Sequence, residues 1–309
     1  LAKTVHMGGN IFDSTKPIKK EHIKPTMKNF LIQFKEIFPK AEPHFGGMKT
    51  LGSVGKKDYS GDIDLALAGK SFDNIEDWGL DKEYVTKLFD GFKKRARTAT
   101  EEQLMKRAVI VAIAQKIEQS NSDIMVDVKG SGSGALFLAF PQFDENSQEV
   151  GDNVQIDVNV GDVDWLEFAY YSSTYKGNVK GLHRTQLMLA MFANKGYTFS
   201  HNYGVKNKET QEIVANNPKQ AIELLNKEYN INLDLNSLSD YFKLVEILKT
   251  NLSREELEGI LNRYIKILDH TRADIPEDLQ DYWIEKQQEL GLKGKFLPDT
   301  SNLVKYKTL

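Results

Sequence analysis

The chain has 309 residues, a formal net charge of −3 and no cysteine. Its hydrophobic content of 40% and charged content of 28% are ordinary for a globular protein of one large or two modest domains. The lack of cysteine excludes disulfides, thiolate metal sites and cysteine nucleophiles. No apolar run approaches the roughly 20 residues of a membrane helix. We therefore expect a cytoplasmic protein without membrane contact, in which oxygen atoms hold any metal.

The first predicted elements lead up to a Gly-Ser turn. Residues 1–25 contain two glycines and two prolines, and we expect them to be irregular. Apolar residues at helical spacing predict a helix over 26–38. Pro39 and Pro43 end that helix, and a short strand to Leu51 follows.

Two aspartates dominate the next segment, LGSVGKKDYSGDIDLAL, which covers residues 51–67. Asp62 and Asp64 flank Ile63 in a period-two pattern that is typical of a strand. Both carboxylates then leave the same face of a sheet, while the isoleucine packs behind them. Two carboxylates on a rigid strand suit Mg²⁺. The alternative interpretation is a hairpin with exposed carboxylates.

The residues before these aspartates favour phosphate as a second ligand. Gly52 and Ser53 form a predicted turn, and Lys56 and Lys57 follow it. Backbone N–H groups in such a turn and nearby ammonium groups can both contact phosphate oxygens. The segment as a whole therefore predicts a site for a metal ion and a triphosphate.

A helical region over 71–119 separates this segment from three further predicted strands, at 123–128, 134–140 and 154–160. The last two are predicted to form an antiparallel hairpin. Asp157 lies in the final strand, with Gln155 and Asn159 on its own face. It is a candidate third metal ligand, and Asp127 is an equal candidate on pattern alone.

From residue 162 onward the pattern is mostly helical. Gly196 is a predicted C-cap, and Ser253 begins a Ser-x-x-Glu capping box. His183 and Arg184 are expected either to contact a base or template, or to lie at the surface. The segments 92–98 (FKKRART) and 293–307 are locally basic, which fits either nucleic-acid contact or solvated charge.

Four motifs in one order resemble the DNA polymerase beta-type nucleotidyltransferase superfamily, and in particular the palm and thumb of the family X DNA polymerases. LGSVGKKDYSGDIDLAL resembles the superfamily signature. KGSGSGALFLAFPQF followed by VQIDVNV resembles the hairpin that carries the third carboxylate, which favours Asp157 over Asp127. FAYYSST resembles the segment near the incoming sugar, with Tyr170 and Tyr171 in the aromatic positions, and MFANKGYTFSHNYGV resembles part of the thumb.

This resemblance implies an α+β fold in which helices flank a small mixed sheet. The implied organisation is an N-terminal extension over 1–24, a catalytic palm over 25–200, and a thumb-like and C-terminal helical domain over 201–309. Asp62, Asp64 and Asp157 would hold two Mg²⁺ ions, for which Mn²⁺ can substitute. Gly52, Ser53 and a lysine would bind the nucleotide phosphates, and a tyrosine would face the sugar.

The implied reaction transfers a nucleotide from an NTP or dNTP and releases pyrophosphate. The expected acceptor is a nucleic acid primer with a free 3′-hydroxyl. The alternative acceptors are a protein, a small molecule or another nucleotide. A non-catalytic binding module would require a damaged set of aspartates. Two residues depart from the family pattern, since Lys56 or Lys57 replaces an arginine of the phosphate loop, and Gln155 replaces an arginine beside the third aspartate.

Overall fold

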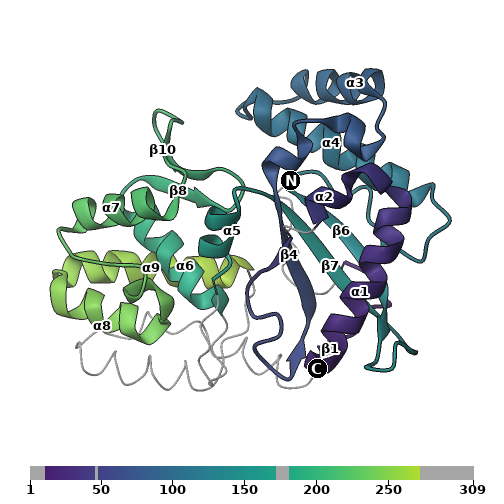
Figure 1. The fold of residues 1–309 in the computed structure, drawn as a ribbon. Helices are drawn as coiled ribbons and strands as arrows, with labels where there is room; N and C mark the ends of the chain where they lie inside the picture. Colours follow the sequence, from purple (N-terminus) through teal and green to yellow (C-terminus); the bar gives the residue numbers. More distant parts are fainter. Residues whose placement is uncertain (1–10, 46–47, 172–180, 272–309) are drawn as a thin grey trace. The chain divides into compact units, whose positions relative to one another are not determined.

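The computed structural model describes residues 11–45, 48–171 and 181–271 (Figure 1). The chain divides into two compact units, Leu1–Glu167 and Phe168–Leu309. The boundary expected after residue 200 falls inside the second unit. Both units contain helices and strands, so the chain is mixed α+β, as predicted. Every helix in the described ranges is too short or too polar to cross a lipid bilayer.

A mixed sheet of five strands forms the centre of the first unit. In spatial order the strands are β2 (Lys49–Thr50), β4 (Asp62–Ala68), β7 (Glu149–Gly161), β6 (Ala135–Phe143) and β5 (Met125–Val126). β4 runs parallel to β7, and the other pairings in this sheet are antiparallel. The predicted hairpin is present as β6 and β7, with residues 144–148 as its loop.

Five helices belong wholly or partly to this unit: α1 (Lys20–Ile37), α2 (Glu42–Phe45), α3 (Lys82–Lys93), α4 (Glu101–Glu118) and α5 (Val163–Ala169). Shorter elements are the 3₁₀ turns η1 (Pro39–Ala41), η2 (Gly69–Phe72) and η3 (Ile75–Trp78), and the strand pair β1 (Ile18–Lys19) and β3 (Tyr59–Ser60). The expectation of an irregular chain up to residue 25 is wrong, because α1 begins at Lys20 and includes Pro25. A proline this close to the helix start removes only one intrahelical hydrogen bond.

The two faces of the sheet differ in chemistry because side chains alternate along each strand. Ile63 and Leu65 of β4, and Ile156 and Val158 of β7, are buried in the apolar core. Side chains of α1 and α4 complete this core, and Figure 1 shows both helices beside the sheet. The polar residues between these positions, including the aspartates, therefore lie on the opposite face.

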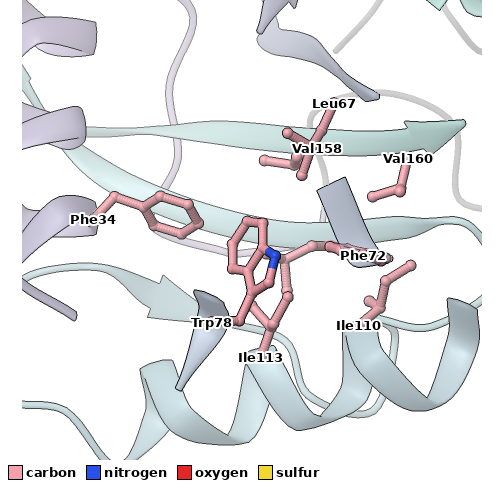
Figure 2. Close-up of a pocket in the computed structure, with 9 residues that line it drawn as sticks. Phe34, Leu67, Phe72, Trp78, Ile110, Ile113, Val158 and Val160 are labelled. Atoms are coloured by element: carbon pink, nitrogen blue, oxygen red, sulfur yellow. The ribbon is translucent and has the colours of Figure 1, made fainter. Parts of the chain in front are cut away.

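Trp78 lies near the centre of the core and is only 1% exposed. The rings of Phe38 and Phe72 each lie 5.4 Å from its ring, in edge-to-face geometry. Its indole N–H donates to the Ser71 carbonyl at 2.7 Å. Figure 2 shows the adjoining cavity, which measures about 10 Å³ and is lined by apolar side chains. A space this small without polar groups is a packing void, because even one water needs polar partners.

The second unit has its own helices and sheet. Its described helices are α6 (Gly181–Asn194), α7 (Pro218–Tyr229), η4 (Ser237–Ser239), α8 (Tyr241–Asn251) and α9 (Arg254–Thr271). Its antiparallel sheet has the order β10 (Ile213–Ala215), β9 (Gly204–Asn207), β8 (Tyr197–Ser200). Gly196 follows α6 with a φ of 82°, as its predicted capping role requires. The predicted cap at Ser253 is also present, since its hydroxyl accepts from the Glu256 N–H at 3.2 Å.

Arg184 ties several elements of the second unit together. Both His183 and Arg184 are buried, so the surface placement considered for this pair is wrong. The guanidinium donates to the carbonyls of Leu238 and Phe168, each at 2.6 Å, and its Cζ lies 4.7 Å from the Phe168 ring centroid. Burial lowers the pKa of Arg184 to about 10. These contacts give Arg184 a structural role inside the unit.

We expect Trp78→Ala to lower the free energy of unfolding by about 3–5 kcal/mol, because it removes a large buried ring and leaves a cavity. Urea denaturation followed by far-UV circular dichroism measures the change. Ile32→Ala is the control, since Ile32 is 49% exposed on α1 and contributes little to the core. Equal stability of the two variants would contradict the central position of Trp78.

Candidate functional site

Three aspartates meet on one face of the sheet because β4 and β7 run parallel. The register pairs Asp64 with Asp157 and Asp62 with Gln155. Neighbouring strands lie about 4.8 Å apart, so the side chains of such a pair are direct neighbours. Asp157 is only 8% exposed, while Asp62 and Asp64 are half-buried. The structure thus brings Asp157 beside Asp62 and Asp64, although 93 residues separate Asp64 from Asp157 in the chain.

The predicted phosphate loop follows β2, the strand that pairs with β4. The Leu51 N–H donates to the Asp64 carbonyl at 2.8 Å, and the turn begins at the next residue, Gly52, with a φ of 63°. Glycine suits this left-handed conformation. Within the turn, the Ser53 carbonyl accepts from the Lys56 N–H at 3.0 Å. The Gly52–Ser53 turn therefore starts one residue beyond the position opposite Asp64.

The two lysines of this loop differ in exposure. Lys56 is exposed, although partial burial of its ammonium group lowers its pKa. Lys57 is half-buried. Gly55 has a φ of 72°, and its N–H donates to the Ser60 hydroxyl at 3.4 Å, which closes the loop onto β3. Both lysines thus lie on a loop held at each end by the strands that flank it.

Gln155 holds the carboxylate of Asp157. Its side-chain nitrogen donates to both oxygens of Asp157, at 2.9 and 3.1 Å. Its side-chain oxygen accepts from the Ile11 N–H at 3.1 Å. Because a backbone N–H can only donate, this bond fixes which end of the amide faces Asp157. The amide supplies these hydrogen bonds without a positive charge.

The N-terminal extension is part of this arrangement. The Lys16 N–H donates to the Asn153 carbonyl at 2.8 Å, and the Gln142 side chain donates to the Lys16 carbonyl at 3.0 Å. These bonds hold Lys16 beside Asn153 of β7, two residues ahead of Gln155, where β4 begins to pair. The sequence pattern places Gln155 on the face of Asp157, but it carries no signal for the partner at Ile11.

Burial and mutual repulsion raise the pKa of two of the carboxyls. Burial raises the pKa of Asp157 to about 7, against hydrogen bonds from Gln155 that lower it, and the charge of Asp62 adds a further rise. Burial also raises the pKa of Asp64 well above its ordinary value, with further rises from Asp62 and Asp157. A hydrogen bond from Asn159 opposes this second shift. The charged forms of Asp64 and Asp157 are therefore unfavourable on this face of the sheet, and a nearby cation would stabilise them.

The donor chemistry of this face fits a hard cation, since Mg²⁺ prefers carboxylate oxygens. Over residues 11–45, 48–171 and 181–271, however, no group of three or more His, Asp or Glu side chains is arranged so that it could hold a metal ion. Both oxygens of Asp157 accept hydrogen bonds from Gln155, which fix the orientation of this carboxylate.

The other candidate for the third metal ligand, Asp127, forms hydrogen bonds within its own turn. Its carboxylate accepts from the N–H groups of Lys129 and Gly130, at 3.1 and 3.0 Å, and so caps its own turn. Its N–H donates to the Phe137 carbonyl at 3.0 Å, and Phe137 is itself paired with Asp157 in the β6–β7 register. A whole strand thus separates Asp127 from Asp157, and the geometry favours Asp157 as the neighbour of Asp64.

Tyr170 and Tyr171 lie in the second unit, just after α5. Both are half-buried. The ring of Tyr170 lies 5.3 Å from that of His201, and the ring of Tyr171 lies 5.4 Å from the Arg184 Cζ. The remainder of the FAYYSST motif, residues 172–174, lies outside the described residues. The expected contact of these tyrosines with a sugar stays a prediction.

Neither the protein-family models nor the curated proteins include a match to this chain. The functional assignment therefore depends on the residues and on their geometry. The strongest part of that geometry is the β4–β7 pairing, because it joins two motifs that the sequence keeps far apart.

In metal-free protein, we expect Asp157→Asn to raise the free energy of unfolding by roughly 2–3 kcal/mol more at about pH 8 than at about pH 5. The raised pKa means that the folded state retains a proton which the unfolded state has lost. In the wild type, the Asp157 carboxyl therefore lowers the free energy of unfolding progressively as the pH rises from the ordinary carboxyl pKa through about 7. Thermal unfolding in EDTA at both pH values measures the effect.

Asp152→Asn is the control for this prediction, because Asp152 is exposed on the same strand. A stabilisation by Asp157→Asn that does not vary with pH would show that the Asp157 carboxyl has an ordinary pKa.

Proposed function

We propose that the chain is a metal-dependent nucleotidyltransferase that transfers a nucleotide from an NTP or dNTP to a nucleic acid 3′-hydroxyl. The observation that carries this proposal is the pairing of Asp64 with Asp157 in the parallel β4–β7 register, with Asp62 on the same face. The Gly52–Ser53 turn adds a phosphate loop beside Asp64. Neighbouring carboxylates and a turn with free backbone N–H groups are what a metal-bound triphosphate requires.

Asp62 and Asp64 are the proposed ligands of two Mg²⁺ ions, and Asp157 is the proposed third ligand; Mn²⁺ can replace Mg²⁺ in such an oxygen site. When bound, these ions neutralise the phosphate charge and polarise the reacting oxygens. The residues fit this role because they supply hard oxygen donors, and because burial, together with smaller contributions from repulsion between the carboxylates, raises the pKa values of Asp64 and Asp157. A bound cation stabilises the charged form of both groups.

The protein's own part is positioning and proton transfer. The acceptor hydroxyl oxygen attacks the α-phosphorus, the bond between that phosphorus and the β-phosphate oxygen breaks, and pyrophosphate leaves. Asp157 is the carboxylate we assign to receive the hydroxyl proton, since it is the most buried of the three. Backbone N–H groups of the turn at Gly52 and Ser53, with Lys56 or Lys57, would hold the leaving phosphates.

We expect Asp64→Asn and Asp157→Asn each to lower nucleotide incorporation by at least about 1,000-fold, because each removes a ligand charge from the reacting centre. The assay incubates full-length protein with a labelled primer, Mg²⁺, and each NTP and dNTP in turn. Asp152→Asn should retain full activity, since Asp152 is exposed on β7 outside the paired region.

Full activity in Asp157→Asn would contradict the assigned site. Labelling of the protein itself, or formation of a dinucleotide without primer, would keep the transferase but replace the proposed acceptor.

We further expect Gln155→Leu to reduce kcat by roughly 10- to 100-fold while KM for the nucleotide changes little. The substitution removes both hydrogen bonds to Asp157, and misplacement of a reacting group by about 1 Å has effects of this size. Steady-state kinetics at saturating primer measure both constants. Gln142→Leu is the matched control, because it loses hydrogen bonds to Lys16 and Pro17 of the same N-terminal segment without touching an aspartate. A similar fall in both variants would show a purely structural effect.

A further inference from the structure

The segment between α3 and α4 concentrates positive charge in a chain whose net charge is negative. Four of the five residues in Lys93–Arg97 are cationic. Lys93 forms an ion pair with Glu101 at 2.5 Å, which ties the segment to the first turn of α4. Lys94, Arg95 and Arg97 are exposed, and within the described ranges no carboxylate forms an ion pair with any of them. These three cations are therefore presented to solvent.

Arg107 of α4 extends the same surface. Its Cζ lies 4.4 Å from the ring centroid of Phe92, the residue directly before the basic segment. The N–H groups of Arg95 and Ala96 both donate to the Phe92 carbonyl, at 3.0 and 2.9 Å, so one further helical turn follows the end of α3. The Arg107 Nε is buried and lacks a hydrogen-bond partner in the part of the chain that the structure describes.

Gly132, between β5 and β6, lies against the Arg107 side chain. A Cβ on Gly132 would lie 3.3 Å from the Arg107 Cγ and 3.4 Å from its Nε, and Gly132 has a φ of 139°. A larger residue would crowd the arginine and strain the backbone. We define the basic surface as Lys94, Arg95, Arg97 and Arg107.

Helix capping explains only part of this surface. Lys93 and Lys94 lie at the C-terminal end of α3, where the helix dipole favours cations. Arg95 and Arg97 lie beyond that helix, and Arg107 lies in the second turn of α4, where the dipole does not stabilise a positive charge. Helix capping therefore does not account for the three arginines.

The basic surface belongs to the same unit as the aspartates but lies on the other side of the sheet, because α4 packs on the apolar face and the aspartates leave the opposite face. Lys106, which precedes Arg107, donates to the Val160 carbonyl at 3.1 Å. Val160 follows Asp157 by three residues on β7, a distance of roughly 10 Å along the strand. Figure 1 shows α3 and α4 side by side next to the sheet. A nucleic acid bound at the basic surface therefore contacts the protein outside the carboxylate face.

We infer that the basic surface binds the phosphate backbone of the nucleic acid acceptor, outside the carboxylate face. This inference rests on the proposed function and names the surface that holds its acceptor. Arginine favours this partner, because its guanidinium forms paired hydrogen bonds with phosphate oxygens. The contacts are with phosphates, so the surface binds without regard to base sequence.

The test measures binding without catalysis. Fluorescence anisotropy follows full-length protein with a labelled single strand and a labelled hairpin primer, in EDTA and without nucleotide, over a range of salt concentrations. The variant Lys94→Ala/Arg95→Ala/Arg97→Ala is compared with Lys24→Ala/Lys28→Ala/Lys40→Ala, which removes the same charge from exposed positions elsewhere in the unit. Arg107→Gln is measured separately.

We expect the first variant to bind at least about 10-fold more weakly at roughly 0.1 M salt, and its log–log salt dependence to be shallower by about 2–3, since each lost phosphate contact contributes about 0.7–0.9. The lysine control should bind as the wild type does. Equal binding by the two triple variants would overturn the inference and leave the proposed transferase intact.

Two further outcomes are decisive. If the wild type transfers nucleotides but binds no nucleic acid, the inference is wrong and the acceptor belongs to another class. If the basic surface instead governs binding to vesicles of anionic phospholipid and not to the oligonucleotides, the inference is also wrong. Loss of nucleic-acid binding in the first variant, in a protein that transfers no nucleotide, would support the surface and refute the proposed function.

Discussion

The parallel pairing of β4 with β7 is the constraint on which the candidate site depends. It places Asp64 beside Asp157 and leaves Ile63 and Ile156 in the core. A slip of one residue would turn each buried isoleucine to the polar face and each aspartate into the core. The same apolar packing that stabilises the unit therefore also holds the carboxylates side by side.

Much of the first unit follows from local pattern. The alternation around Asp62 and Asp64 predicts β4, and the two β-rich runs predict the β6–β7 hairpin; both are confirmed. The pattern could not choose between Asp127 and Asp157, because strand order is a tertiary property. The pattern also could not predict where α1 begins, because a proline such as Pro25 usually marks a helix boundary. In the structure α1 begins earlier, at Lys20, whose backbone N–H donates to the Asp58 carbonyl.

Polar contacts over long sequence distances were the hardest features to predict. Gln155 donates to Asp157 while Ile11, 144 residues away, holds the other end of its amide. Arg184 was expected to contact a base or to lie at the surface, but it is buried between two carbonyls and an aromatic ring. In each case the residue type is visible in the sequence, and its partner depends on how distant segments fold together.

The central claim is that Asp62, Asp64 and Asp157 form one divalent-cation site. Electron paramagnetic resonance of free Mn²⁺ tests it directly, in a titration of full-length protein with and without a non-hydrolysable NTP. The account predicts that the wild type binds about two Mn²⁺ per chain when nucleotide is present, and that Asp64→Asn/Asp157→Asn loses this binding. Equal Mn²⁺ binding by the wild type and that variant would contradict the account.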